Sequence, residues 1–312
     1  MTTSIYSSWL FLIMVIHFLY MEWLMYTGNS CLQTHTITYI RPTDKSTKEA
    51  IIYSTPYKQN KLIMILNGNF QLYKSCYIQK TVEDLYPHVK QTHQIIVYEN
   101  HNIASIELSP DIAQYIKDLH ETQPLHELVL FGFSAGGCVA SHVMSELKST
   151  DFSKKLILYD TPLQVKLNVE SYSQNWFYRP DILYYWMVQN IYSNYYKPVH
   201  WNNQYYGYAS DFIKQIQTIH GYSDEEMLVR TGYNAEQPLY TSVLLIQNKY
   251  DPIVNPEVQK QAHHSIMEEI DYPIRVVQKN TIGHCSDMWW STDYLHPILN
   301  EITASILETD KK

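Results

Sequence analysis

The run Gly132-Phe133-Ser134-Ala135-Gly136-Gly137 constrains the fold of this chain more than any other segment. It follows the apolar run Leu128–Phe131, which is typical of a buried strand, and it precedes a stretch of helical character. A chain that passes from strand to helix here must turn sharply, and side chains at positions 132 and 136 would collide with neighbouring backbone. Glycine at both positions removes that collision. The pattern therefore predicts a strained turn that exposes the Ser134 hydroxyl, and such strain is typical of functional sites.

Length and composition allow a large buried core and exclude some classes of partner. The chain has 312 residues, 45% of them hydrophobic, which suits one large α/β domain or two smaller ones. Its formal net charge of −8 argues against nucleic acid as a partner, because phosphate binding needs clustered Lys and Arg. The four cysteines show no metal-type spacing, so we expect no zinc site, no cofactor and no dense disulfide framework. Cys138 is predicted to be a small core residue.

The segment of residues 1–30 contains a long apolar run, Ile5–Tyr26. At about 1.5 Å per residue, such a helix just crosses a hydrocarbon core of about 30 Å. No Lys or Arg precedes the run and no small-residue cleavage site follows it, whereas the first positive residues, beginning with Arg41, lie on its C-terminal side. The positive-inside rule then predicts an uncleaved membrane anchor with the remainder of the chain in the cytosol. A cleaved signal peptide, with a secreted remainder, and a buried or interfacial helix are the alternatives.

Short apolar runs alternate with helical periodicity along the rest of the chain. Strands are expected at residues 34–40, 50–54, 62–66, 95–98, 128–131, 156–159, 243–246 and 274–277. Helices are expected at residues 72–85 with Pro87 as a stop, from a capping Ser109 to 119, after Ser134, and at 256–267 and 295–307. The first two strands are expected to pair with each other. The alternation predicts an α/β fold with a doubly wound, mostly parallel sheet.

One long interruption, at about residues 161–240, separates the sixth expected strand from the seventh. Its pattern is largely helical and rich in aromatic residues. An insertion at this point predicts a helical cap over the carboxyl ends of the strands, where the active sites of such sheets lie. We therefore expect residues 31–312 to form one α/β domain into which the cap is inserted.

A serine hydroxyl becomes a good nucleophile only when a base takes its proton and a carboxylate orients that base. Asp251 follows the expected strand 243–246 through a turn, and His284 follows the last expected strand on a loop that a preceding glycine makes tight. Asp160 also follows a strand and is the competing acid. It is equally explained as a turn residue before Pro162, so Asp251 is favoured.

The three candidate residues follow the chain order Ser134, Asp251, His284, and Ser134 lies within the segment Gly132–Gly136. On these residues the chain resembles the α/β-hydrolase fold enzymes, and the resemblance covers about Thr34 to Glu308. The resemblance implies that Ser134 attacks a carbonyl carbon as the nucleophile of a catalytic triad. It further implies that His284 shuttles the proton and that Asp251 fixes the orientation of the imidazole. No metal ion is expected in this chemistry.

The same resemblance implies an oxyanion hole of two backbone N–H donors. One is the N–H of Ala135, and the other belongs to the loop Asn67–Phe70. The family often has His-Gly in this loop where the chain has Asn-Gly, which leaves the second donor open. By its position after the glycine, Asn69 is the first choice and Phe70 the second.

The activity that the resemblance implies is hydrolysis of a carboxylic ester through an acyl-serine intermediate. An N-terminal anchor and a cap would place the site beside a bilayer, so the expected substrate is a small-molecule or lipid-derived ester. The alternatives on the same triad are an amidase, a peptidase or a thioesterase. A lyase or acyltransferase of the same fold, and a catalytically silent binding protein, are further alternatives.

Overall fold

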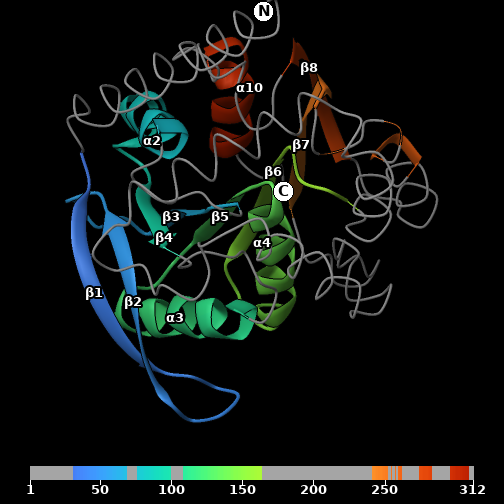
Figure 1. Ribbon diagram of the computed structural model, residues 1–312. Helices are drawn as coiled ribbons and strands as arrows, with labels where there is room; N and C mark the ends of the chain where they lie inside the picture. The colour runs from blue at the N-terminus through green and yellow to red at the C-terminus, as the bar shows by residue number, and fades with distance from the viewer. Residues whose placement is uncertain are drawn as a thin grey trace, which may run out of the picture.

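The computed structural model describes residues 31–68, 76–99, 108–163, 241–251, 254, 257, 259–261, 274–282 and 296–308. Within these residues a twisted sheet lies between pairs of helices (Figure 1). The strands are β1 (Gln33–Ile40), β2 (Thr47–Ser54), β3 (Lys61–Leu66), β4 (Gln94–Glu99), β5 (Glu127–Phe133), β6 (Ser153–Tyr159), β7 (Ser242–Tyr250) and β8 (Ile274–Ile282). The helices are α2 (Cys76–Val89), α3 (Ser109–Thr122), α4 (Ala135–Glu146) and α10 (His296–Leu307).

The strands form one sheet in the order β1-β2-β4-β3-β5-β6-β7-β8. The pairs β1–β2 and β2–β4 are antiparallel, and all the other pairs are parallel. This confirms the predicted mostly parallel sheet, including the pairing of the first two strands. Because β3, β5, β6 and β7 run in the same direction, their carboxyl ends meet at one edge. Ser134 follows the central strand β5 at this edge, which we call the carboxyl edge.

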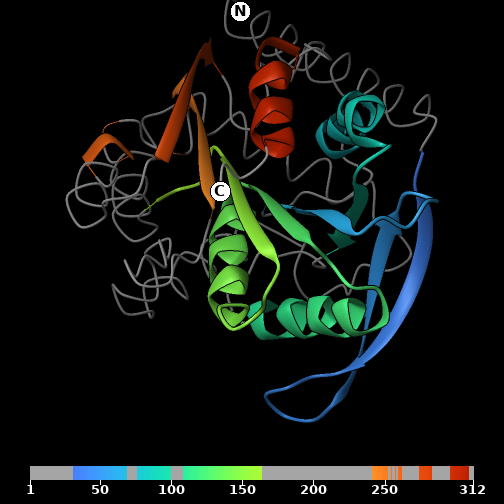
Figure 2. The ribbon, with the colours of Figure 1, turned by 180° about the vertical axis from the view of Figure 1, so that it is seen from behind.

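Helices cover both faces of the sheet, as a doubly wound fold requires. Helices α3 and α4 lie side by side on one face, and α2 and α10 lie together on the other (Figures 1 and 2). Successive residues of β5 point to opposite faces. Leu130 belongs to the cluster that contains Val139 of α4, whereas Phe131 belongs to the cluster that contains Ile302 of α10. The continuous apolar runs of the parallel strands are therefore buried on both sides.

Two helix signals in the sequence led to wrong predictions. Pro87 lies inside α2 and does not end it. It stands in the last turn with its side chain exposed, so the one intrahelical hydrogen bond that its missing N–H forfeits lies at the end of the helix. Ser109 does not cap α3, because the N-cap residue is Leu108 and the Ser109 hydroxyl donates to the carbonyl oxygen of Val139, 3.4 Å away.

Strands β7 and β8 extend furthest beyond their apolar runs. Strand β7 continues to Tyr250 and β8 continues to Ile282, although the sequence predicted turns over their last residues. The physical reason is that strand pairing uses the backbone, so it continues through polar side chains such as Gln247 and Gln278. Asp251 still stands just past the end of its strand, as predicted.

The predicted cap and N-terminal segment fall almost entirely on residues that the structure does not describe. Residues 1–30 and 164–240 lie outside the described residues. Strand β6 ends at Tyr159 and β7 begins at Ser242, so the long insertion does separate two neighbouring strands of the sheet. In the part of the chain that the structure describes, no helix has both the length and the apolar character to cross a membrane.

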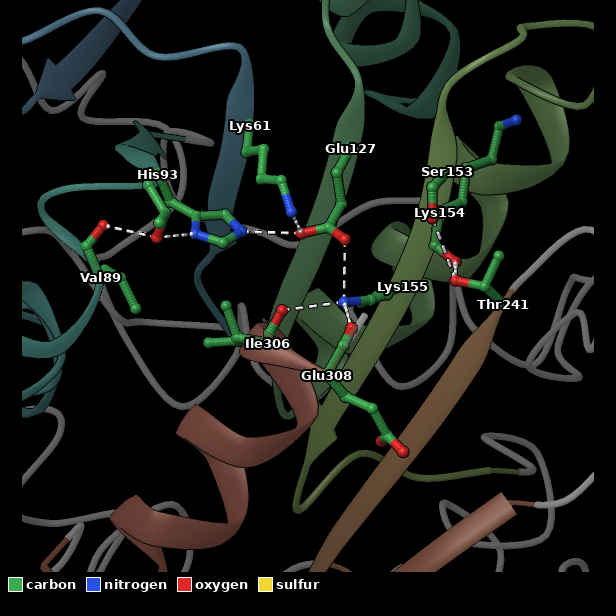
Figure 3. A network of polar contacts seen from close by, with 11 residues as sticks. Lys61, Val89, His93, Glu127, Ser153, Lys154, Lys155, Thr241, Ile306 and Glu308 are labelled. Carbon is green, nitrogen blue, oxygen red and sulfur yellow. Dashed lines mark hydrogen bonds and ion pairs between the residues drawn. The ribbon is translucent and has the colours of Figure 1, made fainter. Parts of the chain in front are cut away.

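A buried ionic cluster joins the strands at the opposite edge of the sheet (Figure 3). Glu127, the first residue of β5, lies at its centre. Its Oε1 lies 2.8 Å from Nε2 of His93 and 3.6 Å from Nζ of Lys61, and its Oε2 lies 2.9 Å from Nζ of Lys155. His93 and Lys155 are almost completely buried. The carboxylate therefore neutralises a charge in the core and binds the first residues of β3, β5 and β6, and the residue that precedes β4, to one another.

Lys155 also completes the end of helix α10 (Figure 3). Its Nζ donates to the carbonyl oxygens of Ile306 at 2.8 Å and Glu308 at 2.6 Å. The last carbonyl groups of a helix lack intrahelical partners, and a positive charge there also suits the helix dipole. One buried ammonium group thus connects β5, β6 and the last described helix.

The cluster predicts how stability depends on pH. Burial opposes ionisation of Glu127, but hydrogen bonds from His93 and Lys155 outweigh it and lower the pKa of Glu127 from 4.5 to about 2. A lowered pKa stabilises the fold above pH 4.5, and this contribution is lost as the pH falls toward 2. We expect Glu127→Gln to reduce the free energy of unfolding at neutral pH by about 3–5 kcal/mol, because Lys155 keeps a buried, unpaired charge.

Chemical denaturation between pH 7 and about pH 2.5 measures both effects, since this range contains most of the interval between the ordinary pKa of 4.5 and the lowered pKa of about 2. The variant should show a flatter pH dependence than the wild type over that window. Glu121→Gln, at an exposed position of α3, is the matched control and should behave as the wild type. Equal slopes in wild type and Glu127→Gln would contradict the assignment.

Candidate active site

Ser134 stands at the turn between β5 and α4 with a backbone conformation that non-glycine residues rarely adopt. Its φ is 50° and its ψ is −128°. Its N–H donates to the carbonyl oxygen of Tyr159 at 2.9 Å, and its own carbonyl accepts from the N–H of Gly137 at 3.0 Å. Such a conformation costs about 1–3 kcal/mol and persists only where the surrounding structure enforces it. The predicted strained turn is confirmed, and the Ser134 side chain is partly exposed.

The glycines of the turn are required by close backbone contacts. A Cβ at Gly132 would lie closer than 3.0 Å to the backbone of Gly137, a separation that Cβ atoms essentially never show. A Cβ at Gly136 would meet the carbonyl oxygens of Leu66 and Asn67 in the same way. This confirms the predicted collisions. It also shows that the N-terminus of α4 lies against the end of β3, where the loop of the expected second oxyanion donor begins.

Helix α4 begins at Ala135, directly after the serine. The Ser134 side chain does not cap the helix. The first N–H groups of a helix have no intrahelical partner and carry the positive end of its dipole, so an anion is stabilised there. Ala135 therefore stands where an oxyanion donor is needed, and its role stays a prediction. Asn69 and Phe70 lie outside the described residues, which end on this side at Asn67 and Gly68.

Cys138 lies one turn into α4 and is a core residue, as predicted. Its thiol donates to the carbonyl oxygen of Pro162 at 3.5 Å. Burial raises the pKa of the Cys138 thiol to about 12, and the thiolate is the reactive form of cysteine. Cys138 is therefore no rival to Ser134 as a nucleophile.

The two candidate acids have different surroundings. Asp251 is buried directly after β7, and its Oδ1 accepts from the N–H of Val254 at 2.8 Å. Asp160 is buried directly after β6, and both of its oxygens accept hydrogen bonds from Asn248 of β7. The Asp160 carboxylate is thus engaged in holding two strands together. Both carboxylates are engaged, Asp251 within its own turn and Asp160 between two strands, and the choice of Asp251 as the acid stays a prediction.

The end of β8 lies beside the residue that precedes Asp251. The strand pairing is irregular after Asn248, and beyond this point Ile282 of β8 pairs with Tyr250 of β7. His284 follows Ile282 by two residues and lies outside the described residues. The structure thus brings Ser134, Ala135 and Asp251 to the carboxyl edge and leaves the position of the predicted base open.

Sequence reasoning missed Gln259, a buried residue of this edge. Its Oε1 accepts from the N–H of Leu163 at 2.8 Å, and its Nε2 donates to the carbonyl oxygen of Thr161 at 2.6 Å. Gln259 thereby fixes the segment that leaves β6. Thr161 of this segment packs against Gly137 of α4. A glutamine in an expected helix carries no sequence signal for such a contact, since its partners lie almost a hundred positions earlier.

Comparison with known proteins identifies the fold. No family model matches the chain, and no curated protein matches its sequence. An esterase of Pyrococcus furiosus shares 13% identity over 88% of this chain and 90% of its own, with a TM-score of 0.56. A hyperthermophilic esterase of the archaeon Pyrobaculum calidifontis shares 15% identity over 95% and 92% of the two chains, with a TM-score of 0.55. The chain has the α/β-hydrolase fold.

An arylesterase structure also matches, with 11% identity over 91% of this chain and 87% of its own and a TM-score of 0.51. In the α/β-hydrolase fold the nucleophile stands on the sharp turn after a central strand, which is the position of Ser134. Among the described residues, no group of three or more His, Cys, Asp or Glu side chains could hold a metal ion.

The contact of Gly136 predicts the outcome of a substitution. Gly136→Ala should destabilise the protein by about 2–3 kcal/mol, because the added methyl group meets backbone that cannot rotate away. The free energy of unfolding, measured by chemical denaturation, checks this. Ser145→Ala, a partly exposed position of the same helix, is the control and should change it by less than about 0.5 kcal/mol. A fully stable Gly136→Ala protein would contradict the packing described.

Proposed function

We propose that the protein is a serine hydrolase that cleaves a carboxylic ester through an acyl-serine intermediate. The observation that carries the proposal is the conformation of Ser134, a partly exposed serine held at positive φ at the carboxyl edge of a parallel sheet. A strained serine between a central strand and a helix N-terminus is arranged for nucleophilic attack, because the helix dipole favours the oxyanion that forms beside it.

The proposed reaction has two halves. Ser134 Oγ attacks the carbonyl carbon while His284 takes the hydroxyl proton, and Asp251 orients the imidazole. The N–H groups of Ala135 and Asn69 stabilise the oxyanion of the tetrahedral intermediate. The intermediate collapses with loss of the alcohol, which takes the proton from His284. Water then attacks the acyl-serine with the same base and releases the carboxylic acid.

The choice of an ester, rather than an amide or a thioester, is supported by the names of solved structures that share the fold. Two of them are called esterases and a third is called an arylesterase. A lipid-derived acyl group is the finer part of the proposal. It is supported by the apolar run Ile5–Tyr26, which as a membrane anchor would hold the enzyme beside a lipid phase.

Substitution of the nucleophile tests the reaction. We expect Ser134→Ala to lower kcat for nitrophenyl esters by about 10⁴-fold or more, because a triad without its nucleophile keeps only the oxyanion hole and binding. Acetate, butyrate and palmitate esters, assayed with membrane and soluble fractions, compare short and long acyl chains. Ser145→Ala is the matched serine control and should retain full activity. Hydrolysis by Ser134→Ala at the wild-type rate would refute the proposal.

A fluorophosphonate probe separates an active enzyme from a silent binding protein. The wild type should be labelled on the peptide that contains Ser134, and Ser134→Ala should not be labelled. Amides and thioesters with the same acyl group, assayed in parallel, should be cleaved more slowly than the ester. No labelling of the wild type would favour the silent binding protein, and faster cleavage of the amide or thioester would replace the ester in the proposal.

A further inference from the structure

We propose that Asp160 is a positioning residue, which acts through Asn248 to fix the end of β7 that carries Asp251. The inference rests on the proposed function, since Asp251 is the acid of the proposed triad. We call the pair of Asp160 and Asn248 the strand clamp. Asp160 Oδ1 accepts from the backbone N–H of Asn248 at 2.7 Å, and Oδ2 accepts from its side-chain Nδ2 at 2.5 Å.

The strand clamp continues a line of hydrogen bonds that begins at the nucleophile. The N–H of Ser134 donates to the carbonyl oxygen of Tyr159, which directly precedes Asp160. The N–H of Asp160 donates to the carbonyl oxygen of Ile246 at 2.8 Å. The carboxylate of Asp160 then reaches two residues further along β7. Three adjacent strands are thereby fixed to one another at the level of Ser134.

The regular pairing of β7 does not extend to Asp251 by itself. The ladder between β6 and β7 ends at the pair of Tyr159 with Ile246, five residues before Asp251. On the other side, the pairing with β8 becomes irregular after Asn248. The strand clamp therefore holds β7 at the point where its ladder to β6 has ended and its ladder to β8 shifts register.

The local structure of Asp160 indicates more than a turn residue. An aspartate in a turn bonds to N–H groups two or three positions further on, whereas Asp160 bonds to a residue 88 positions away. Its φ is 45°, and it adopts this conformation directly after β6, as Ser134 does directly after β5. Both members of the clamp are buried, at 1% and 3% exposure, where a hydrogen bond to a carboxylate is stronger than in water.

Exchange of the two side chains tests the strand clamp. Asp160→Asn removes the charge and leaves two amides, which can form only weaker neutral hydrogen bonds after the Asn248 amide turns over, whereas Asn248→Asp places two carboxylates against each other. The double variant Asp160→Asn/Asn248→Asp restores both hydrogen bonds, because the new amide accepts from the backbone N–H and donates to the new carboxylate. Asparagine also tolerates positive φ, so the backbone at position 160 is not strained further.

We expect Asn248→Asp to lower kcat for the best ester by about 10–100-fold and Asp160→Asn to lower it by less, each with KM within about twofold, because misplacement of a triad member affects the chemical step. The double variant should recover kcat to within about threefold of the wild type. Asp111→Asn, an equally buried aspartate that binds Arg41 away from β6 and β7, is the control for loss of a buried charge. It should lower stability and leave kcat unchanged.

Hydrogen exchange measures the strand clamp without a substrate. The peptide that covers residues 242–251 should exchange faster in each single variant and recover protection in the double variant. This readout holds even if the wild type cleaves no ester, so failure of the proposed function is seen separately. Single variants with wild-type kcat and wild-type exchange, or a double variant that recovers neither, would overturn the proposal.

Discussion

The carboxyl edge of this sheet depends on how closely helix α4 approaches the strands beside it. The helix begins one residue after β5 ends, so it must start between the end of β3 and the segment that leaves β6. Gly136 lies against the carbonyl groups of Leu66 and Asn67, and Gly137 lies against Thr161. Any side chain at either glycine would push the helix away. The strained conformation of Ser134 is thus the consequence of packing on both sides of the helix.

Strain at one end of β5 is accompanied by strong polar contacts at the other. Glu127 begins the strand with a buried carboxylate that binds His93 and Lys155, and Ser134 follows the end of the strand with a rare backbone conformation. Backbone strain persists only where the surrounding structure over-determines it. The strand between them is apolar and buried on both faces. The buried ionic cluster and the proposed nucleophile therefore stand at opposite ends of one strand.

The strands were predictable because parallel strands buried on both faces are continuous apolar runs, and Leu62–Leu66 and Leu128–Phe131 are such runs. The polar ends of the strands could not be predicted from hydropathy, because backbone pairing carries β7 through Gln247 to Tyr250. The turn around Ser134 could be predicted from its own glycines. The bond of Asp160 to Asn248 could not, because its partners are far apart in sequence and meet only through the order of the strands.

The contacts of Lys155 have a consequence for how the chain folds during its synthesis. Its ammonium group needs the carbonyl oxygens of Ile306 and Glu308, which leave the ribosome about 150 residues later. Until then a buried lysine lacks two of its acceptors, and the face of the sheet that α10 covers stays open to solvent. N-terminal segments ordinarily fold first during translation. Here the face of the sheet beside α10 is covered only after α10 has emerged, so this apolar face of the nascent chain needs protection until then.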